Sequence, residues 1–278
     1  MDKILIVDGS SLLFQSFFGM PKKIKNKSGK NIEAVICFVG ILNKTIKYIN
    51  PTKLLIVFDG ETKLERKQID KNYKDNRKSF ADEKDEDNPF LQLEIIKNVL
   101  DFLKYCYYET TNCEADDYIA SITNLLKEKN EIIISSQDKD FYQLISNNVK
   151  VFSYRGKQSN LIDEQFVQNK YGFEAKYFTT LKSLIGDNSD NISGAKGIGI
   201  KTATKLIKEY GDLENILLNT NKLPQKIKEI IENYKQKLLQ NYFIIDLKQK
   251  CDEFDIKNLE FVLTSKSTME ILNQLDLL

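Results

Sequence analysis

The chain has 278 residues, of which 41% are hydrophobic and 29% are charged, as expected for a folded globular protein. It contains no histidine, which excludes serine–histidine and cysteine–histidine catalysis, histidine-ligated zinc and a histidine general base. Any enzymatic chemistry must therefore come from carboxylates, lysines, tyrosines and metal ions. The apolar runs are far shorter than the roughly 20 residues of a membrane span, so we expect no membrane association.

The net charge of +1 hides an uneven distribution of lysine along the chain. Residues 21–30 hold five lysines and residues 194–208 hold four, and neither run contains an acidic residue. Either run alone is most simply a solvated surface. The net charge therefore does not exclude a protein that binds nucleic acid.

The cysteines and the N-terminus indicate where the protein works. Cys37, Cys106, Cys113 and Cys251 show no CxxC or other zinc-binding spacing, so we expect reduced thiols in the core. The first residues do not form a signal peptide, because only four apolar residues precede Asp8. These features predict a cytoplasmic protein.

Three apolar runs without polar alternation predict strands at residues 3–8, 53–59 and 131–138. Such runs are typical of strands that are covered on both faces, as in a parallel sheet. Helical patterns lie between and after them, at about residues 33–49, 90–104 and 115–128. This alternation predicts a doubly wound α/β fold with a mostly parallel sheet.

Each of the three predicted strands ends on or near aspartate. Asp8 and Asp59 close the first two, and Asp138 and Asp140 follow the third. A single aspartate after a strand is usually a turn residue or a helix cap. Three strand ends with the same residue type favour a ligand site instead, since ligands bind beyond the carboxyl ends of parallel strands.

Further carboxylates come from two other segments. Glu114, Asp116 and Asp117 open the third predicted helix, and Asp187 and Asp190 stand three apart, on one face if that segment makes a helical turn. Clustered like charges repel one another unless a cation compensates them, and Mg²⁺ prefers such oxygen ligands. Nine acids are too many for one metal ion, so we expect two ions, with some carboxylates lying outside the direct ligands. The candidates are Asp8, Asp59, Glu114, Asp116, Asp117, Asp138, Asp140, Asp187 and Asp190.

Residues 61–89 form a long polar stretch that contains Tyr73, Lys74 and Arg77. It is either a solvated connection or a mobile arch, in which the two cations face a phosphate and the tyrosine stacks on a base. Residues 82–87 are strongly acidic, so we place them away from any nucleic acid.

A glycine turn at residues 197–199 leads into an amphipathic helix. Glycine allows another backbone to approach closely, so this turn can present bare N–H groups to a phosphate. Lys201, Lys205 and Lys208 share one face of the helix, and Ala203, Leu206, Ile207 and Tyr210 lie on the other, before Gly211 ends it. Residues 212–219, 224–235 and 235–247 read as further short helices.

Together the motifs resemble the 5′ nuclease family, which includes the N-terminal 5′–3′ exonuclease domain of bacterial DNA polymerase I, phage 5′ nucleases and flap endonucleases. The matching pieces are VDGSSLLF, VFDG, YKDNR, CEADD, SSQDKDFYQL and GDNSDNISGAKGIGIKTA, in family order from residue 7 to residue 204. Each is weak alone, and their combination is specific.

The resemblance implies two Mg²⁺ ions, which Mn²⁺ can replace. One would bind Asp8, Asp59, Glu114, Asp116 and Asp117, and the other Asp138, Asp140, Asp187 and Asp190. It also implies that Lys74 and Arg77 contact a phosphate and that Tyr73 positions the terminal nucleotide.

The resemblance further implies an α/β catalytic domain over residues 1–180, with an arch at 61–89. A helical DNA-binding region would follow over 181–278, with a helix–three-turn–helix at about 184–210. This motif would grip the duplex backbone, often with a K⁺ ion. Its expected contacts are Lys196, Gly197, Gly199, Lys201, Thr202 and Lys205.

The expected function is structure-specific hydrolysis of DNA at 5′ flaps, nicks or gaps, and of RNA–DNA primer junctions, in replication and repair. The acidic run stands where the family has a proline-rich turn, and nothing follows Leu278. We therefore expect a free-standing, monomeric nuclease that works beside a DNA polymerase. A PIN-like ribonuclease and a non-catalytic DNA-binding module are the alternatives.

Overall fold

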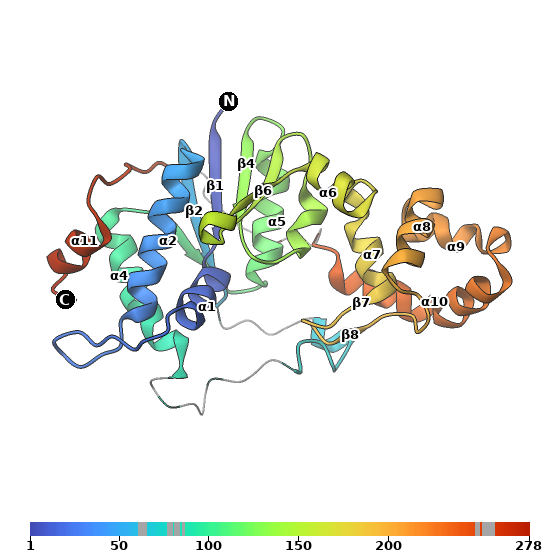
Figure 1. Ribbon diagram of the computed structural model, residues 1–278, viewed down its shortest axis with the longest axis horizontal. Helices are drawn as coiled ribbons and strands as arrows, with labels where there is room; N and C mark the ends of the chain where they lie inside the picture. The colour runs from blue at the N-terminus through green and yellow to red at the C-terminus, as the bar shows by residue number, and fades with distance from the viewer. Residues whose placement is uncertain (61–65, 77–79, 81–83, 85–86, 248–250, 252–258) are drawn as a thin grey trace.

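Figure 1 shows the computed structural model of the chain, an α/β body with a helical extension on one side. The structure describes residues 1–60, 66–76, 80, 84, 87–247, 251 and 259–278. Arg77 and most of the acidic run at 82–87 therefore lie outside the described residues, whereas Tyr73 and Lys74 of the predicted arch at 61–89 lie within them.

A six-stranded sheet forms the centre of the α/β body, in the order β3-β2-β1-β4-β5-β6. Neighbouring strands are parallel except for β6, which runs antiparallel to β5. The strands are β1 (Lys3–Asp8), β2 (Lys53–Phe58), β3 (Tyr107–Glu109), β4 (Glu131–Ser135), β5 (Val149–Ser153) and β6 (Asn160–Ile162). The three predicted strands thus occupy the middle of the sheet, in the order 53–58, 3–8, 131–135.

Both faces of the sheet are buried, which explains the uninterrupted apolar runs. Ile4 and Ile6 of β1 belong to one core with Ile119, while Leu5 and Val7 belong to a second core with Phe38. Each fully buried aliphatic side chain stabilises the fold by about 1.5–3 kcal/mol relative to an exposed one. The helices that supply these cores are α1 (Gly9–Gly19), α2 (Glu33–Ile49), α4 (Leu93–Leu103) and α11 (Thr268–Gln274) on one face, and α5 (Ala115–Leu126), α6 (Glu164–Tyr171) and α7 (Phe178–Ile185) on the other.

The helical extension follows α7 (Figure 1). It begins with a small hairpin, β7 (Gly186–Asp187) and β8 (Ile192–Ser193), and continues with α8 (Ile200–Tyr210), α9 (Leu213–Leu218) and α10 (Gln225–Ile245). The short α3 (Arg66–Ile69) packs against α10. The remaining turns are the 3-10 helices η2 (Pro89–Gln92), η3 (Asp140–Leu144), η4 (Gly156–Gln158), η5 (Ala175–Tyr177) and η6 (Thr220–Lys222).

The structure confirms the mostly parallel sheet with helices and the helical C-terminal region, and it corrects two local expectations. Residues 225–245 form one continuous helix, where the sequence predicted two, because no breaker separates them. Asp187 and Asp190 lie on the β7–β8 hairpin, so a chain reversal brings them together and not a helical turn. Across the described residues, no helix is both long enough and apolar enough to cross a bilayer.

The expectation that all four cysteines are free thiols was wrong. Cys113 and Cys251 form a disulfide whose Cα atoms are 6.1 Å apart, and only Cys37 and Cys106 remain free. The partners are 138 residues apart in the chain, so their spacing carries no signal that could have predicted the bond.

We expect reduction of this disulfide to lower the melting temperature, because the bond constrains a long loop in the unfolded chain. A loop of this length corresponds to about 4–5 kcal/mol in the chain-entropy model, and measured values are often lower. Calorimetry with and without dithiothreitol measures the effect, which Cys251→Ser should abolish and Cys37→Ser should preserve. Identical melting curves for the oxidised and reduced protein would contradict the expectation.

Candidate active site

Asp8 and Asp59 stand at the carboxyl ends of β1 and β2, where each also caps a helix. Asp8 Oδ1 accepts a hydrogen bond from the Ser11 N–H at the start of α1, 2.9 Å away. Asp59 Oδ1 accepts one from the Ala115 N–H at the start of α5, at 2.8 Å. Each aspartate can therefore both cap a helix and serve as a site residue, because only one of its carboxylate oxygens accepts the capping bond.

A serine that the sequence reasoning missed joins Asp8 to Asp138. The Ser136 hydroxyl donates to Asp8 Oδ2 at 2.7 Å and accepts from the Asp138 N–H at 3.0 Å. Ser136 lies inside the SSQDKD motif just after β4, so the motif itself was the available signal. Through this link β1 and β4 hold two acids at the same edge of the sheet.

Asp116 belongs to the same group. Repulsion among these carboxylates contributes to the raised pKa values of Asp8 and Asp116. Burial raises the pKa of Asp8 to about 7, and the charges of Asp59 and Asp138 act in the same direction. Burial also raises the pKa of Asp116 well above its ordinary value, with contributions from Asp138, Asp8 and Asp59. We call Asp8, Asp59, Asp116 and Asp138 the sheet-end acids.

Without a cation, we expect the protein to lose stability as the pH rises. The folded-state pKa of Asp8 exceeds its unfolded value, so the folded form holds a proton that the unfolded form releases. This contribution is complete below about pH 4 and is lost as the pH passes about 7, a total change on the order of 4 kcal/mol, of which about half falls between about pH 5.5 and about pH 8. Urea unfolding in chelator at about pH 5.5 and about pH 8 measures it, and Asp8→Asn should flatten the dependence. Equal or greater stability at the higher pH would contradict it.

A second acidic group consists of Asp140, Asp187 and Asp190, which we call the hairpin acids. One carboxylate oxygen from each lies within 4.8 Å of the others. The amino group of Lys182 on α7 pairs with both Asp140 and Asp187, at 2.6 Å from Asp187 Oδ2. Burial would raise the pKa of Asp187, but Lys182 and the Ser189 hydrogen bonds lower it below the ordinary value. The sequence analysis had not singled out Lys182.

Glu114 and Asp117 form a third group, paired with cations. The Arg66 guanidinium donates to Glu114 Oε2 at 2.9 Å and to Asp117 Oδ1 at 2.6 Å. Lys74 Nζ and the Tyr73 hydroxyl donate to the same Glu114 oxygen. Burial would raise the pKa of Glu114, but Lys74 and Arg66 lower it below its ordinary value. Burial dominates for Asp117, whose pKa rises to about 6.

These contacts change the predicted grouping of the acids and place Tyr73 and Lys74 against other parts of the chain. Asp138 lies with the sheet-end acids rather than only with the hairpin acids. Tyr73 is 2% exposed and packs with Ile192, Ile244 and Ile245, so its ring offers no free face for a base. The polar sequence around Tyr73 gave no sign of this burial. Lys74 is likewise occupied by Glu114 in this structure.

Helix α8 presents the expected basic face. Lys201, Lys205 and Lys208 are exposed, while Ala203, Leu206 and Ile207 are buried. The helix N-cap is Gly199, which forms no side-chain capping bond. Gly197 adopts φ +100°, a conformation that favours glycine, whereas Gly199 does not need it. Lys196, Gly197 and Gly199 are exposed and Thr202 is half-buried, so this turn is open to a partner.

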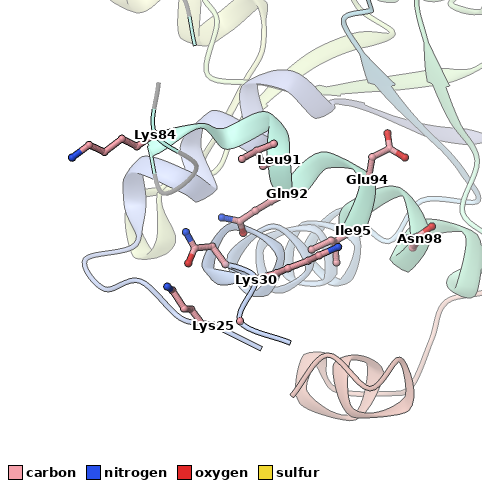
Figure 2. Close-up of a pocket in the computed structure, with 10 residues that line it drawn as sticks. Lys25, Lys30, Lys84, Leu91, Gln92, Glu94, Ile95 and Asn98 are labelled. Carbon is pink, nitrogen blue, oxygen red and sulfur yellow. The ribbon is translucent and has the colours of Figure 1, made fainter. Parts of the chain in front are cut away.

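The first lysine run borders a separate hollow of about 640 Å³ (Figure 2). Lys25 and Lys30 come from the loop before α2, and Lys84, Glu94 and Asn98 are among the other lining residues. None of the nine predicted acids lines it. Lysines outnumber acids in this hollow, which is separate from the three acidic groups described above.

The sheet-end acids and the hairpin acids are suited to binding divalent cations. The sheet-end acids repel one another, and Glu114 Oε1 is buried without a hydrogen-bond partner among the described residues. The hairpin acids already attract one cation, the Lys182 amino group. Hard oxygen donors of this kind suit Mg²⁺ or Mn²⁺.

Two protein-family models match this chain. The 5′-3′ exonuclease N-terminal resolvase-like domain matches residues 3–172, and the 5′-3′ exonuclease C-terminal SAM fold matches residues 173–267. A 5′-3′ exonuclease of Buchnera aphidicola is 33% identical over 96% of this chain and 95% of its own length. The thermostable DNA polymerase I of Thermus thermophilus is 35% identical over 85% of this chain, which spans only 28% of that polymerase.

Solved structures share the fold. The bacteriophage T5 5′-exonuclease with bound zinc superposes with a TM-score of 0.71 at 24% identity, covering 88% of this chain and 90% of the phage protein. The catalytic core of Rad2 in complex with DNA gives a TM-score of 0.62 at 17% identity, covering 98% of this chain and 88% of that core.

Proposed function

Because the chain belongs to the 5′-3′ exonuclease family, we propose that it is a structure-specific 5′ nuclease that hydrolyses DNA phosphodiester bonds with divalent metal ions. The observation that carries this proposal is the gathering of acids from five segments at the carboxyl ends of the strands, beside a lysine and a basic helix. A binding module would gain nothing from this repulsion between buried carboxylates.

In this proposal the sheet-end acids and the hairpin acids each hold one ion, Mg²⁺ or Mn²⁺, with Glu114 Oε1 as a further donor. Bound ions of this kind supply hydroxide near neutral pH and offset the charge of the phosphate. Lys74 stabilises the extra negative charge that develops on the phosphate. Arg77 would assist it, and that residue lies outside the described part of the chain.

The α8 turn would hold the duplex at a distance from the chemistry. Its open N-terminus and three exposed lysines are suited in charge to a phosphate backbone. A K⁺ ion at this turn remains a prediction. The match to a DNA polymerase I supports a role beside a DNA polymerase. A role in replication and repair, on flaps, nicks, gaps or primer junctions, is part of the proposal. We also propose that the protein acts as a cytoplasmic monomer with 1–180 and 181–278 as its domains.

We expect Lys201→Ala to weaken binding to duplexes of any sequence by a similar factor. The contact is to phosphate, so the slope of log affinity against log salt should become shallower by about one. Fluorescence anisotropy in chelator over a salt series measures this, with Lys226→Ala on α10 as an exposed-lysine control. If the salt-dependence slope of Lys201→Ala equals that of the wild type, Lys201 does not contact the DNA.

The test of the function is cleavage of a 5′-labelled flap duplex with Mg²⁺ and with chelator, beside the same duplex without a flap. Metal-dependent release of a labelled flap piece is the expected result. Cleavage of single-stranded RNA alone would favour the PIN-like ribonuclease. Binding without cleavage in either Mg²⁺ or Mn²⁺ would favour a non-catalytic module.

A further inference from the structure

Arg66 is a buried cation that none of the family motifs quoted above contains. It begins α3, is 4% exposed, and lies among the acids of the first turn of α5. Its two terminal nitrogens reach different carboxylates, Glu114 at 2.9 Å and Asp117 at 2.6 Å. A guanidinium can bridge two acids in this way because its donors diverge in a rigid plane.

Arg66 also belongs to the segment that carries Lys74. Residues 66–76 are tied to the rest of the molecule at several points, including Lys237 Nζ to Asp70 at 2.8 Å and the Lys74 N–H to the Asp190 carbonyl at 3.0 Å. Lys74 itself adopts φ +54°, a left-handed conformation that a lysine keeps only when its surroundings impose it. Arg66, together with Tyr73 and Lys74, ties this segment to the start of α5.

All three donors from the segment converge on one oxygen of Glu114. Arg66, Tyr73 and Lys74 each donate to Oε2, which leaves Oε1 buried and without a described partner. An oxygen in this state is held in place and available to a ligand. The convergence therefore fixes both the rotation of the Glu114 carboxylate and the position of the Lys74 amino group.

We propose that Arg66 is a positioning residue of the nuclease site, which rests on the proposed function. It touches neither DNA nor metal. By bridging Glu114 and Asp117 it sets the direction in which Glu114 Oε1 points and holds Lys74 beside the acids. Residues that orient ligating side chains typically change metal affinity by about 10–100-fold when removed.

A purely structural ion pair is the competing explanation, since removal of one partner of any buried pair destabilises a protein. Arg66→Met keeps much of the side-chain volume and removes the donors. Lys150→Met is a control for the loss of an ion pair outside the site, because it breaks the half-buried Lys150–Glu131 pair at the opposite end of the sheet. The readouts are melting temperature, flap-duplex affinity in chelator, Mn²⁺ affinity by calorimetry, and the single-turnover rate.

We expect both variants to melt at lower temperature and to bind the flap duplex within about threefold of wild type in chelator, because Arg66 makes no DNA contact. Only Arg66→Met should lose Mn²⁺ affinity by about tenfold or more, together with at least tenfold in rate. Arg66→Lys should recover part of each loss, because a lysine reaches one carboxylate but cannot bridge two.

Mn²⁺ affinity and rate in Arg66→Met that match Lys150→Met would overturn the proposal. If Arg66→Met does not fold, Arg66→Lys provides the test. Wild-type Mn²⁺ affinity and rate in Arg66→Lys would overturn the bridging role, and an intermediate loss in both would support it. If wild type binds Mn²⁺ but cleaves no substrate, the proposed function fails, and the Mn²⁺ comparison still tests Arg66.

Discussion

Asp116→Asn is expected to reduce the single-turnover rate by at least about 10³-fold while the metal-free protein stays as stable as wild type or becomes more stable. Burial and the neighbouring acids raise the pKa of Asp116, so its negative charge costs stability whenever it is present without a cation. Asparagine keeps the shape and removes that charge. The same change should remove most of the rise in melting temperature that Mg²⁺ produces.

The opposite response of activity and stability is what separates a ligand role from a structural role. Asp101→Asn is a suitable control, because Asp101 is exposed on α4 and bonds only to the Tyr107 hydroxyl among the described residues. Loss of stability in Asp116→Asn without metal, or a rate within tenfold of wild type, would remove Asp116 from the proposed site.

Lys74→Met is expected to lower the single-turnover rate by about 10²–10³-fold, with a much smaller change in affinity for the flap duplex. In this structure burial would lower the pKa of Lys74, but Tyr73, Asp116, Glu114 and Asp190 outweigh it and raise the pKa. The amino group is therefore a permanent positive charge at working pH, positioned at the edge of the acids. Methionine fills similar space without that charge.

Tyr73→Phe provides the matched control for Lys74. It removes one hydrogen bond to the same Glu114 oxygen and keeps the buried ring, so we expect less than about a tenfold loss of rate. Equal losses in the two variants would mean that Glu114 orientation, and not the lysine charge, is what the segment contributes. A larger loss of DNA affinity than of rate in Lys74→Met would assign the lysine to binding.

The sequence predicted those parts of the molecule that repeat a simple pattern. Apolar runs ending in aspartate located β1, β2 and β4, because strands buried on both faces lack alternation. The 3.6-residue period located α8 with its basic and apolar faces. The strands β3, β5 and β6 were missed. β3 and β6 have only three residues each, and a lysine interrupts the apolar run of β5, so none gives a clear strand pattern.

The site was predictable in its residue types but not in its pairings. Spacing cannot show that Arg66 and Glu114, 48 residues apart, share a hydrogen bond, or that Lys182 joins two acids. The burial of Tyr73 was unpredictable for the same reason: it depends on α10 and β8, which come much later in the chain. Tertiary contacts decide these features.

Diffraction from crystals soaked in Mn²⁺ is the sharpest test of the two proposed metal sites. We expect two anomalous peaks, one among Asp8, Asp59, Asp116 and Asp138 and one among Asp140, Asp187 and Asp190. The Lys182 amino group should lie farther from Asp187 than the 2.6 Å found here, since the second ion takes its place. No peak at either acidic group, under conditions in which the flap duplex is cleaved, would contradict the account.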